Sequence, residues 1–214
     1  MIVLKRSHQK SQNGDFWIGF SDLMTGLMLV FIILSLTFMA IAKKKLDEVQ
    51  DNKKNIIVIL SEKLASENIK VEYNAEKGTV TIAQDILFDQ KAASLNTEGK
   101  AFITLFSNIL NENILSKKEY SHLVKFVHIE GYASREGSEV YNFSLSFERA
   151  MNVWLSMTQN VKENRLMMKQ KLNIVSRGEI EAEQNFTKDS DRKVMFRFEF
   201  YDVYNKIFEG LSSS

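Results

Sequence analysis

One aspartate in an apolar stretch has the clearest chemical implication in this sequence. Residues 16–42, FWIGFSDLMTGLMLVFIILSLTFMAIA, contain a single charge, Asp22. At helical spacing, Gly19, Thr25 and Gly26 share its face, and such small residues let a neighbouring helix come close. Ionisable side chains within membranes usually face a protein interior or a water-filled path, and proton relays are a leading use. We therefore expect Asp22 to carry an ion; the alternative is an interfacial Asp that reaches lipid headgroups.

The stretch around Asp22 is long enough to cross a membrane. Residues 23–42 carry no charge, and 20 helical residues at about 1.5 Å each span about 30 Å, the thickness of a hydrocarbon core. Phe16 and Trp17 lie where interfacial aromatic side chains gather. A signal peptide would have a shorter apolar region, and a buried core helix would have a polar face. These features predict a transmembrane helix over residues 16–42.

The charges around this helix leave its orientation open. Three basic residues stand on each side, namely Lys5, Arg6 and Lys10 before it and Lys43, Lys44 and Lys45 after it. The positive-inside rule therefore does not decide which end of the helix is cytoplasmic. A short tail, residues 1–15, ahead of a long folded region favours a cytoplasmic N-terminus.

The pattern of residues 43–69 predicts a juxtamembrane helix or linker. This segment either pairs with a second copy of the chain or is solvated.

Strand and helix patterns alternate over residues 70–203. Residues 76–78, Glu-Lys-Gly, are typical of a hairpin turn, and Thr97 is the expected N-cap of a helix. The fold class is thus a single N-terminal transmembrane helix plus an α+β domain, a β-sheet with helices on one face, followed by a tail at 204–214. The expected strands are 69–73, 79–83, 126–130, 173–177 and 194–201, and the expected helices are one from Thr97 and one over 139–157.

Composition excludes several classes of function. The net charge is +1, which argues against a nucleic-acid partner, and the absence of Cys removes thiolate metal sites and cysteine nucleophiles. The three histidines are not at metal-ligand spacing from one another. No catalytic triad or phosphate-binding loop appears. We therefore expect no enzyme, no metal site and no cofactor.

The segment around Asp22 resembles a known signature. Residues 21–28, SDLMTGLM, are similar to the transmembrane signature of MotB-type stator subunits, in which an Asp followed by Met and Thr carries the translocated ion. The resemblance places Asp22 in the ion-carrying position. An Asp with few other polar neighbours favours H⁺ over Na⁺ as that ion.

The C-terminal region, residues 70–203, resembles OmpA-like peptidoglycan-binding domains. The resemblance lies in residues 85–89 (DILFD), in residues 131–134 (GYAS), and in residues 192–194 (RKV), together with a run that contains Tyr141, Asn142, Leu145, Ser146, Arg149 and Ala150. Spacing over the central motif is kept without gaps.

The family's ligand-binding residues are carried over by position. The resemblance gives Arg149 the role of the guanidinium that grips a peptide-stem carboxylate, an interaction that can form two parallel hydrogen bonds. Tyr141, Asn142 and Leu145 match pocket-wall positions. Ser134 stands where the family has an Asp, so it supplies a neutral contact in place of a charge.

A membrane helix with an Asp, followed by a peptidoglycan-type domain, is the layout of a stator B subunit. The resemblance implies a homodimer within a ring of five copies of a multi-helix MotA-like or ZorA-like partner, in the bacterial inner membrane, with a cytoplasmic N-terminus and a periplasmic C-terminal domain bound to peptidoglycan. The apolar span and the short linker favour the ZorB-type branch of the Zorya anti-phage system. The alternatives are a flagellar MotB-type subunit and a static membrane-to-wall anchor without ion flow.

Overall fold

The computed structural model describes residues 9–69, 71–89, 92–161, 163–182 and 191–201. They form two compact units, Met1–Glu48 and Val49–Ser214. Part of the expected N-terminal tail, residues 1–8, and all of the expected C-terminal tail, residues 204–214, lie outside the described residues.

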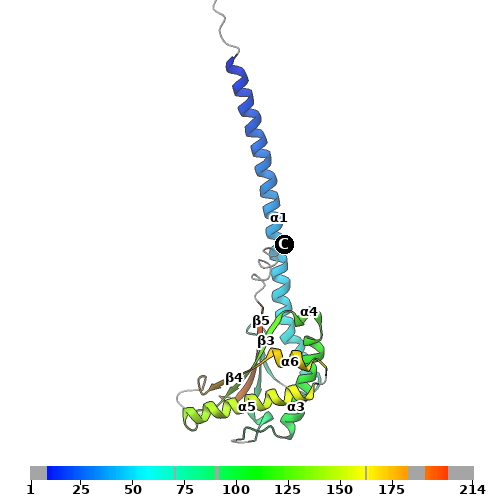
Figure 1. Cartoon of the computed structure of the whole chain (residues 1–214), viewed down its shortest axis with the longest axis vertical. Helices are drawn as coiled ribbons and strands as arrows, with labels where there is room; N and C mark the ends of the chain where they lie inside the picture. The colour runs from blue at the N-terminus through cyan, green and yellow to red at the C-terminus, as the bar shows by residue number, and fades with distance from the viewer. Residues whose placement is uncertain (1–8, 70, 90–91, 162, 183–190, 202–214) are drawn as a thin grey trace, which may run out of the picture. The chain divides into compact units, whose positions relative to one another are not determined.

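One continuous helix, α1, runs from Gln9 to Ser66 (Figure 1). The chain contains no Pro, and so nothing along α1 removes a backbone donor or clashes with the preceding turn. In the described part of the chain, α1 is the one helix that is long and apolar enough to cross a membrane, judged by length and composition alone. The large apolar side chains between residues 16 and 41 of α1 are exposed, as at Leu23, Phe31 and Phe38. The predicted membrane and juxtamembrane helices are therefore parts of one element.

The last turns of α1 belong to the core of the second unit. Ile56, Ile57, Leu60 and Leu64 are fully buried there. These side chains recur on one helix face, which the sequence assigned either to pairing with a second copy or to a solvated linker. The compact unit instead begins at Val49 and includes most of the segment expected to be linker.

The second unit contains a five-stranded sheet in the order β1-β2-β5-β3-β4. Its strands are β1 (Glu72–Asn74), β2 (Thr79–Ala83), β3 (Val124–Tyr132), β4 (Leu172–Gly178) and β5 (Lys193–Phe200). The expected hairpin joins β1 to β2, and Gly78 occupies its turn with a φ of 65°, a conformation that favours glycine. β3 and β4 are parallel, whereas every other pair is antiparallel. The first strand starts three residues later than predicted.

Helices cover one face of this sheet, as expected. Buried Val194, Phe196 and Phe198 of β5 point to that face and alternate with more exposed residues. The predicted N-cap is one residue off, because the Asn96 side chain accepts the hydrogen bond from Gly99 N. The helical elements after α1 are α2 (Gln84–Leu87), α3 (Thr97–Leu110), the π-helix η1 (Asn111–Leu115), α4 (Lys118–Ser121), α5 (Glu139–Asn160) and α6 (Arg165–Lys171).

A buried carboxylate organises the opposite face of the sheet. Glu130 of β3 is 1% exposed and forms a bidentate pair with Arg197, with distances of 2.9 and 3.1 Å. Arg177 and the Tyr132 hydroxyl also donate to it, at 2.8 and 2.7 Å. Burial alone raises the pKa of Glu130, but the hydrogen bonds from Arg197, Arg177 and Tyr132 outweigh it and hold this pKa at about 2.

The buried end of α1 predicts where a soluble fragment must begin. Four fully buried side chains at roughly 1.5–3 kcal/mol each contribute on the order of 6–12 kcal/mol, comparable with the whole stability of a domain. We expect a fragment of residues 49–214 to unfold cooperatively in urea and a fragment of residues 70–214 to lack a cooperative transition. Glu62→Ala, an exposed change on the same turns, is the control and should leave the midpoint unchanged. Equal midpoints for the two fragments would contradict this role of α1.

The low pKa of Glu130 predicts acid sensitivity. A depressed carboxyl pKa stabilises the fold above the unfolded-state value of 4.5, and this contribution is lost as the pH falls towards 2. From this group we expect the free energy of unfolding of fragment 49–214 to fall by about 3 kcal/mol across that window. Glu130→Gln should be less stable at neutral pH, because two guanidinium groups lose their anion, and should show a flatter dependence on pH. Parallel pH profiles for Glu130→Gln and the control Glu62→Gln would refute the assignment.

Candidate functional site

A close contact between β3 and α5 sets the position of the candidate site. A Cβ at Gly131 would lie 2.1 Å from the Ser146 carbonyl oxygen, so a side chain there would push α5 off the sheet. The Ser146 hydroxyl also bonds the Ser176 hydroxyl at 2.6 Å and accepts from Gly178 N at 3.1 Å. At its N-terminus, α5 is capped by Ser138, whose side chain accepts from Tyr141 N. The backbone of α5 is therefore held against β3 and β4.

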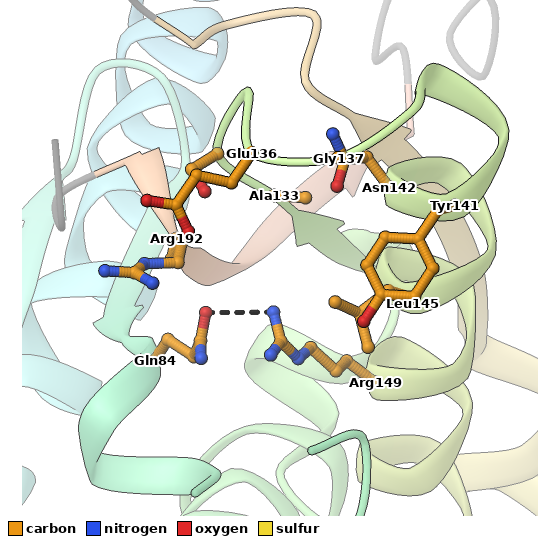
Figure 2. Close-up of a pocket in the computed structure, with 10 residues that line it drawn as sticks. Gln84, Ala133, Glu136, Gly137, Tyr141, Asn142, Leu145, Arg149 and Arg192 are labelled. Carbon is orange, nitrogen blue, oxygen red and sulfur yellow. Dashed lines mark hydrogen bonds between the residues drawn. The ribbon is translucent and has the colours of Figure 1, made fainter. Parts of the chain in front are cut away.

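One flank of α5 lines a pocket of about 270 Å³. The other walls come from α2, from the loop after β3 and from Arg192, the residue immediately before β5. Figure 2 shows Tyr141 and Leu145 on one side of this space and Glu136 and Arg192 on the other. The lining residues are Gln84, Ala133, Ser134, Glu136, Gly137, Tyr141, Asn142, Leu145, Arg149 and Arg192.

Arg149 is a buried cation held by neutral groups. Its side chain is 2% exposed, its Nε donates to the Ala92 carbonyl at 3.0 Å, and one terminal nitrogen donates to Gln84 Oε1 at 2.9 Å (Figure 2). The guanidinium also lies 5.5 Å from the centre of the Phe88 ring. Burial lowers the pKa of Arg149 to about 10, so the group stays charged at neutral pH. A buried charge with neutral partners is costly, and an anion entering the pocket would offset that cost.

The pocket rim combines fixed and exposed side chains. Asn142 is buried and donates to Glu179 at 2.6 Å, which fixes its amide. Tyr141 is 48% exposed. Gly137 lies against the Tyr141 ring: its φ is 107°, and a Cβ there would be 3.1 Å from that ring. Ser134 is buried at the wall. The rim thus offers an aromatic surface beside hydrogen-bonding groups.

The charges in this pocket suit a ligand with both signs of charge. Arg149 and Arg192 present guanidinium groups, which can hold a carboxylate in a planar geometry. Glu136, from the loop after β3, supplies a carboxylate to the same space. Because Ser134 is neutral, Glu136 is the acidic group of the lining that can meet an ammonium.

All five residues that the sequence assigned to this pocket line it: Ser134, Tyr141, Asn142, Leu145 and Arg149. Of the two carboxylates nearest to Ser134 in the sequence, Glu136 lines the pocket, whereas Glu130 is held by Arg177 and Arg197 and does not. Sequence reasoning missed Gln84 and did not assign Arg192 to the site. Arg192 stands inside the 192–194 motif, and that motif was the available signal.

Asp22 lies on α1 in the first unit. Its side chain is exposed there, and a Cβ at Gly19 or Gly26 would meet no atom within 4 Å. Thr25 donates its hydroxyl to the Ser21 carbonyl at 2.8 Å, a bond inside the helix. The face that carries Asp22 is therefore open to a neighbouring helix.

The chain is similar to known proteins both in fold and in sequence. No family model matches the chain. A crystal structure of a MotB-like protein from Desulfovibrio vulgaris superposes with a TM-score of 0.53 at 13% identity, covering 73% of this chain and 96% of that chain. The second unit therefore shares its fold with this MotB-like protein, as the sequence predicted.

In sequence, the chain is similar to the Zorya protein ZorB. It is 23% identical to ZorB of Escherichia coli strain E24377A over 218 residues, which cover 95% of this chain and 87% of that protein. It is 26% identical to ZorB of Escherichia coli strain ATCC 8739 over 170 residues, or 75% of this chain and 71% of that protein. The chain is thus MotB-like in fold and ZorB-like in sequence, and the expected resemblance is confirmed.

Proposed function

We propose that this chain is the peptidoglycan-anchored, ion-conducting stator subunit of a rotary membrane motor of the Zorya type. The observation that carries the proposal is the buried Arg149 in a pocket of a MotB-like domain, on the same chain as an apolar helix with a single carboxyl. The similarity to ZorB over most of the chain supports the Zorya branch over a flagellar one.

In this proposal, the domain of residues 70–203, together with the end of α1, holds the cell wall. A stem-peptide carboxylate binds the Arg149 guanidinium, and its charge compensates the buried cation. Tyr141 packs on the peptide, Asn142 and Leu145 shape the wall of the pocket, and Ser134 gives a neutral hydrogen bond. The ligand is peptidoglycan, with no cofactor or metal and no catalytic step.

The ion path runs past Asp22 in this proposal. Residues 1–15 are cytoplasmic, residues 16–42 cross the inner membrane, and the domain is periplasmic. Two copies of the chain stand inside a ring of five multi-helix ZorA-like partners, so that each Asp22 meets a partner helix and carries a proton across. A static anchor would need no carboxyl in the membrane, and Asp22 therefore separates the two functions.

Wall binding tests the role of the pocket. We expect fragment 49–214 to sediment with isolated cell walls and Arg149→Ala to lose roughly ten- to a hundredfold in affinity, because a charge-assisted hydrogen bond is worth about 1.5–3 kcal/mol. Arg149→Lys should also bind weakly, since an ammonium cannot form the planar fork.

Two further variants distinguish a loss of binding from a loss of folding. Tyr141→Ala changes a half-exposed rim residue and should weaken binding in a folded domain. Glu148→Ala, an exposed change on the same helix, is the matched control and should bind like wild type. Unchanged binding by folded Arg149→Ala would show that the pocket is misassigned.

Ion flux tests the role of Asp22. In the complete complex, Asp22→Asn keeps the size and hydrogen bonding of the side chain but cannot exchange a proton. We expect assembly to persist while ion flux and biological activity disappear. Asp15→Asn, the same chemical change outside the apolar stretch, should retain both. Full flux in Asp22→Asn would leave the static anchor as the function of the chain.

A further inference from the structure

A second surface of α5 has no place in the proposed wall-binding site. Val140, Phe143, Phe147 and Met151 are 77%, 53%, 42% and 39% exposed, and Trp154 is partly buried. We call these five residues the α5 stripe. Successive helical positions turn by about 100°, so intervals of three and four keep all five on one face. Large apolar side chains gathered on one helix face are a feature of interaction surfaces.

The α5 stripe and the pocket lie on different flanks of the helix. Ser146, Ala150 and Val153 face the sheet and are fully buried. By helical geometry, the stripe lies to one side of this buried row, whereas Leu145 and Arg149 lie to the other. Figure 1 shows α5 beside β4, which is the last strand in the described sheet order. A partner on the stripe would therefore leave the pocket open.

The spacing of the α5 stripe is symmetrical about Phe147. The intervals along Val140, Phe143, Phe147, Met151 and Trp154 are three, four, four and three residues. In an antiparallel pair of identical helices related by a two-fold axis at Phe147, Phe143 would face Met151 and Val140 would face Trp154 of the other copy. A closed two-fold interface requires such self-complementarity, whereas an unrelated partner does not.

We propose that the α5 stripe is the contact between two copies of this domain, with the α5 helices packed antiparallel across Phe147. This inference names the surface used by the dimer of the proposed function and rests on that function for the number of copies. It assigns the two flanks of α5 different tasks, wall binding on one and self-association on the other.

The exposed area sets the expected strength of this contact. At roughly 150–250 Å² for a large side chain, the exposed fractions leave on the order of 400 Å² of apolar surface per copy. Two copies would bury about 800 Å², below the roughly 1,200 Å² of a stable specific interface. The stripe alone therefore gives a weak dimer. Two copies anchored in one membrane complex gain affinity from their high effective concentration.

A membrane surface is a poorer occupant of the same stripe. The charged residues of α5 are Glu139, Glu148 and Arg149, and Arg149 is buried. Helices that lie on anionic membranes carry Lys and Arg beside their apolar face, and α5 presents carboxylates there.

The absence of native Cys allows a direct test in the full chain. Phe147→Cys places a thiol on the proposed two-fold axis, and Glu148→Cys places one a single residue away, turned off the stripe. Both variants are expressed with the partner in bacterial membranes and oxidised mildly. We expect most of the Phe147→Cys chain to shift to a disulfide-linked dimer and Glu148→Cys to remain largely monomeric.

The copy number of the purified complex separates the two proposals. Two copies per complex without a Phe147→Cys dimer would overturn the stripe contact and leave the proposed function intact. A single copy would contradict the stoichiometry of the proposed function itself. Equal crosslinking of both variants would also overturn the inference, as would a product that joins residue 147 to a different protein. A chain that carries both Phe147→Asp and Lys44→Cys should still form the disulfide-linked dimer through residue 44, because Phe147→Asp removes only the contact between the domains.

Discussion

The close approach of α5 to β3 is the contact on which both proposed surfaces depend. It requires Gly131, because any Cβ would meet the Ser146 backbone at 2.1 Å. The Ser146–Ser176 hydrogen bond then fixes the height and the rotation of the helix over β4. With the rotation fixed, Arg149 is turned inward to Ala92 and Gln84, and Phe147 is turned outward. A rotation of a few tens of degrees would expose the guanidinium and bury part of the stripe.

Arg149 is a buried cation that folding alone would not favour. Its bonds go to a carbonyl and to an amide, so the fold satisfies its geometry but leaves its charge without an anion among those partners. Glu130 shows the opposite arrangement on the other face of the sheet, where two guanidinium groups and a hydroxyl surround one carboxylate. The first arrangement is suited to a ligand, and the second to stability.

The parts of this protein that could be predicted from sequence are those encoded locally. The β1–β2 hairpin follows from Gly78 between two β-branched runs, and α5 follows from a capped, periodic segment. The five predicted pocket residues stand within a 16-residue stretch whose spacing is informative by itself. Gln84, by contrast, is 65 residues from Arg149, and only the folded chain brings them together. The end of α1 was ambiguous for another reason, since an apolar row at helical spacing is the same whether it meets a second copy or its own domain. The roles of Asp22 and of the pocket residues remain predictions.

The strand order has a consequence for how the second unit folds. Among the described residues, β5 is the last strand in the sequence, yet it lies between β2 and β3 at the centre of the sheet. Until residues 193–200 have been synthesised, the hairpin β1–β2 and the β3–α5–β4 unit have no strand to join them, and each presents an unpaired inner edge. Such non-local pairing is slow, because distant segments must meet before any contact stabilises them. A chain that emerges N-terminus first therefore completes this sheet in its final step, and its half-sheets are open to misassembly until then.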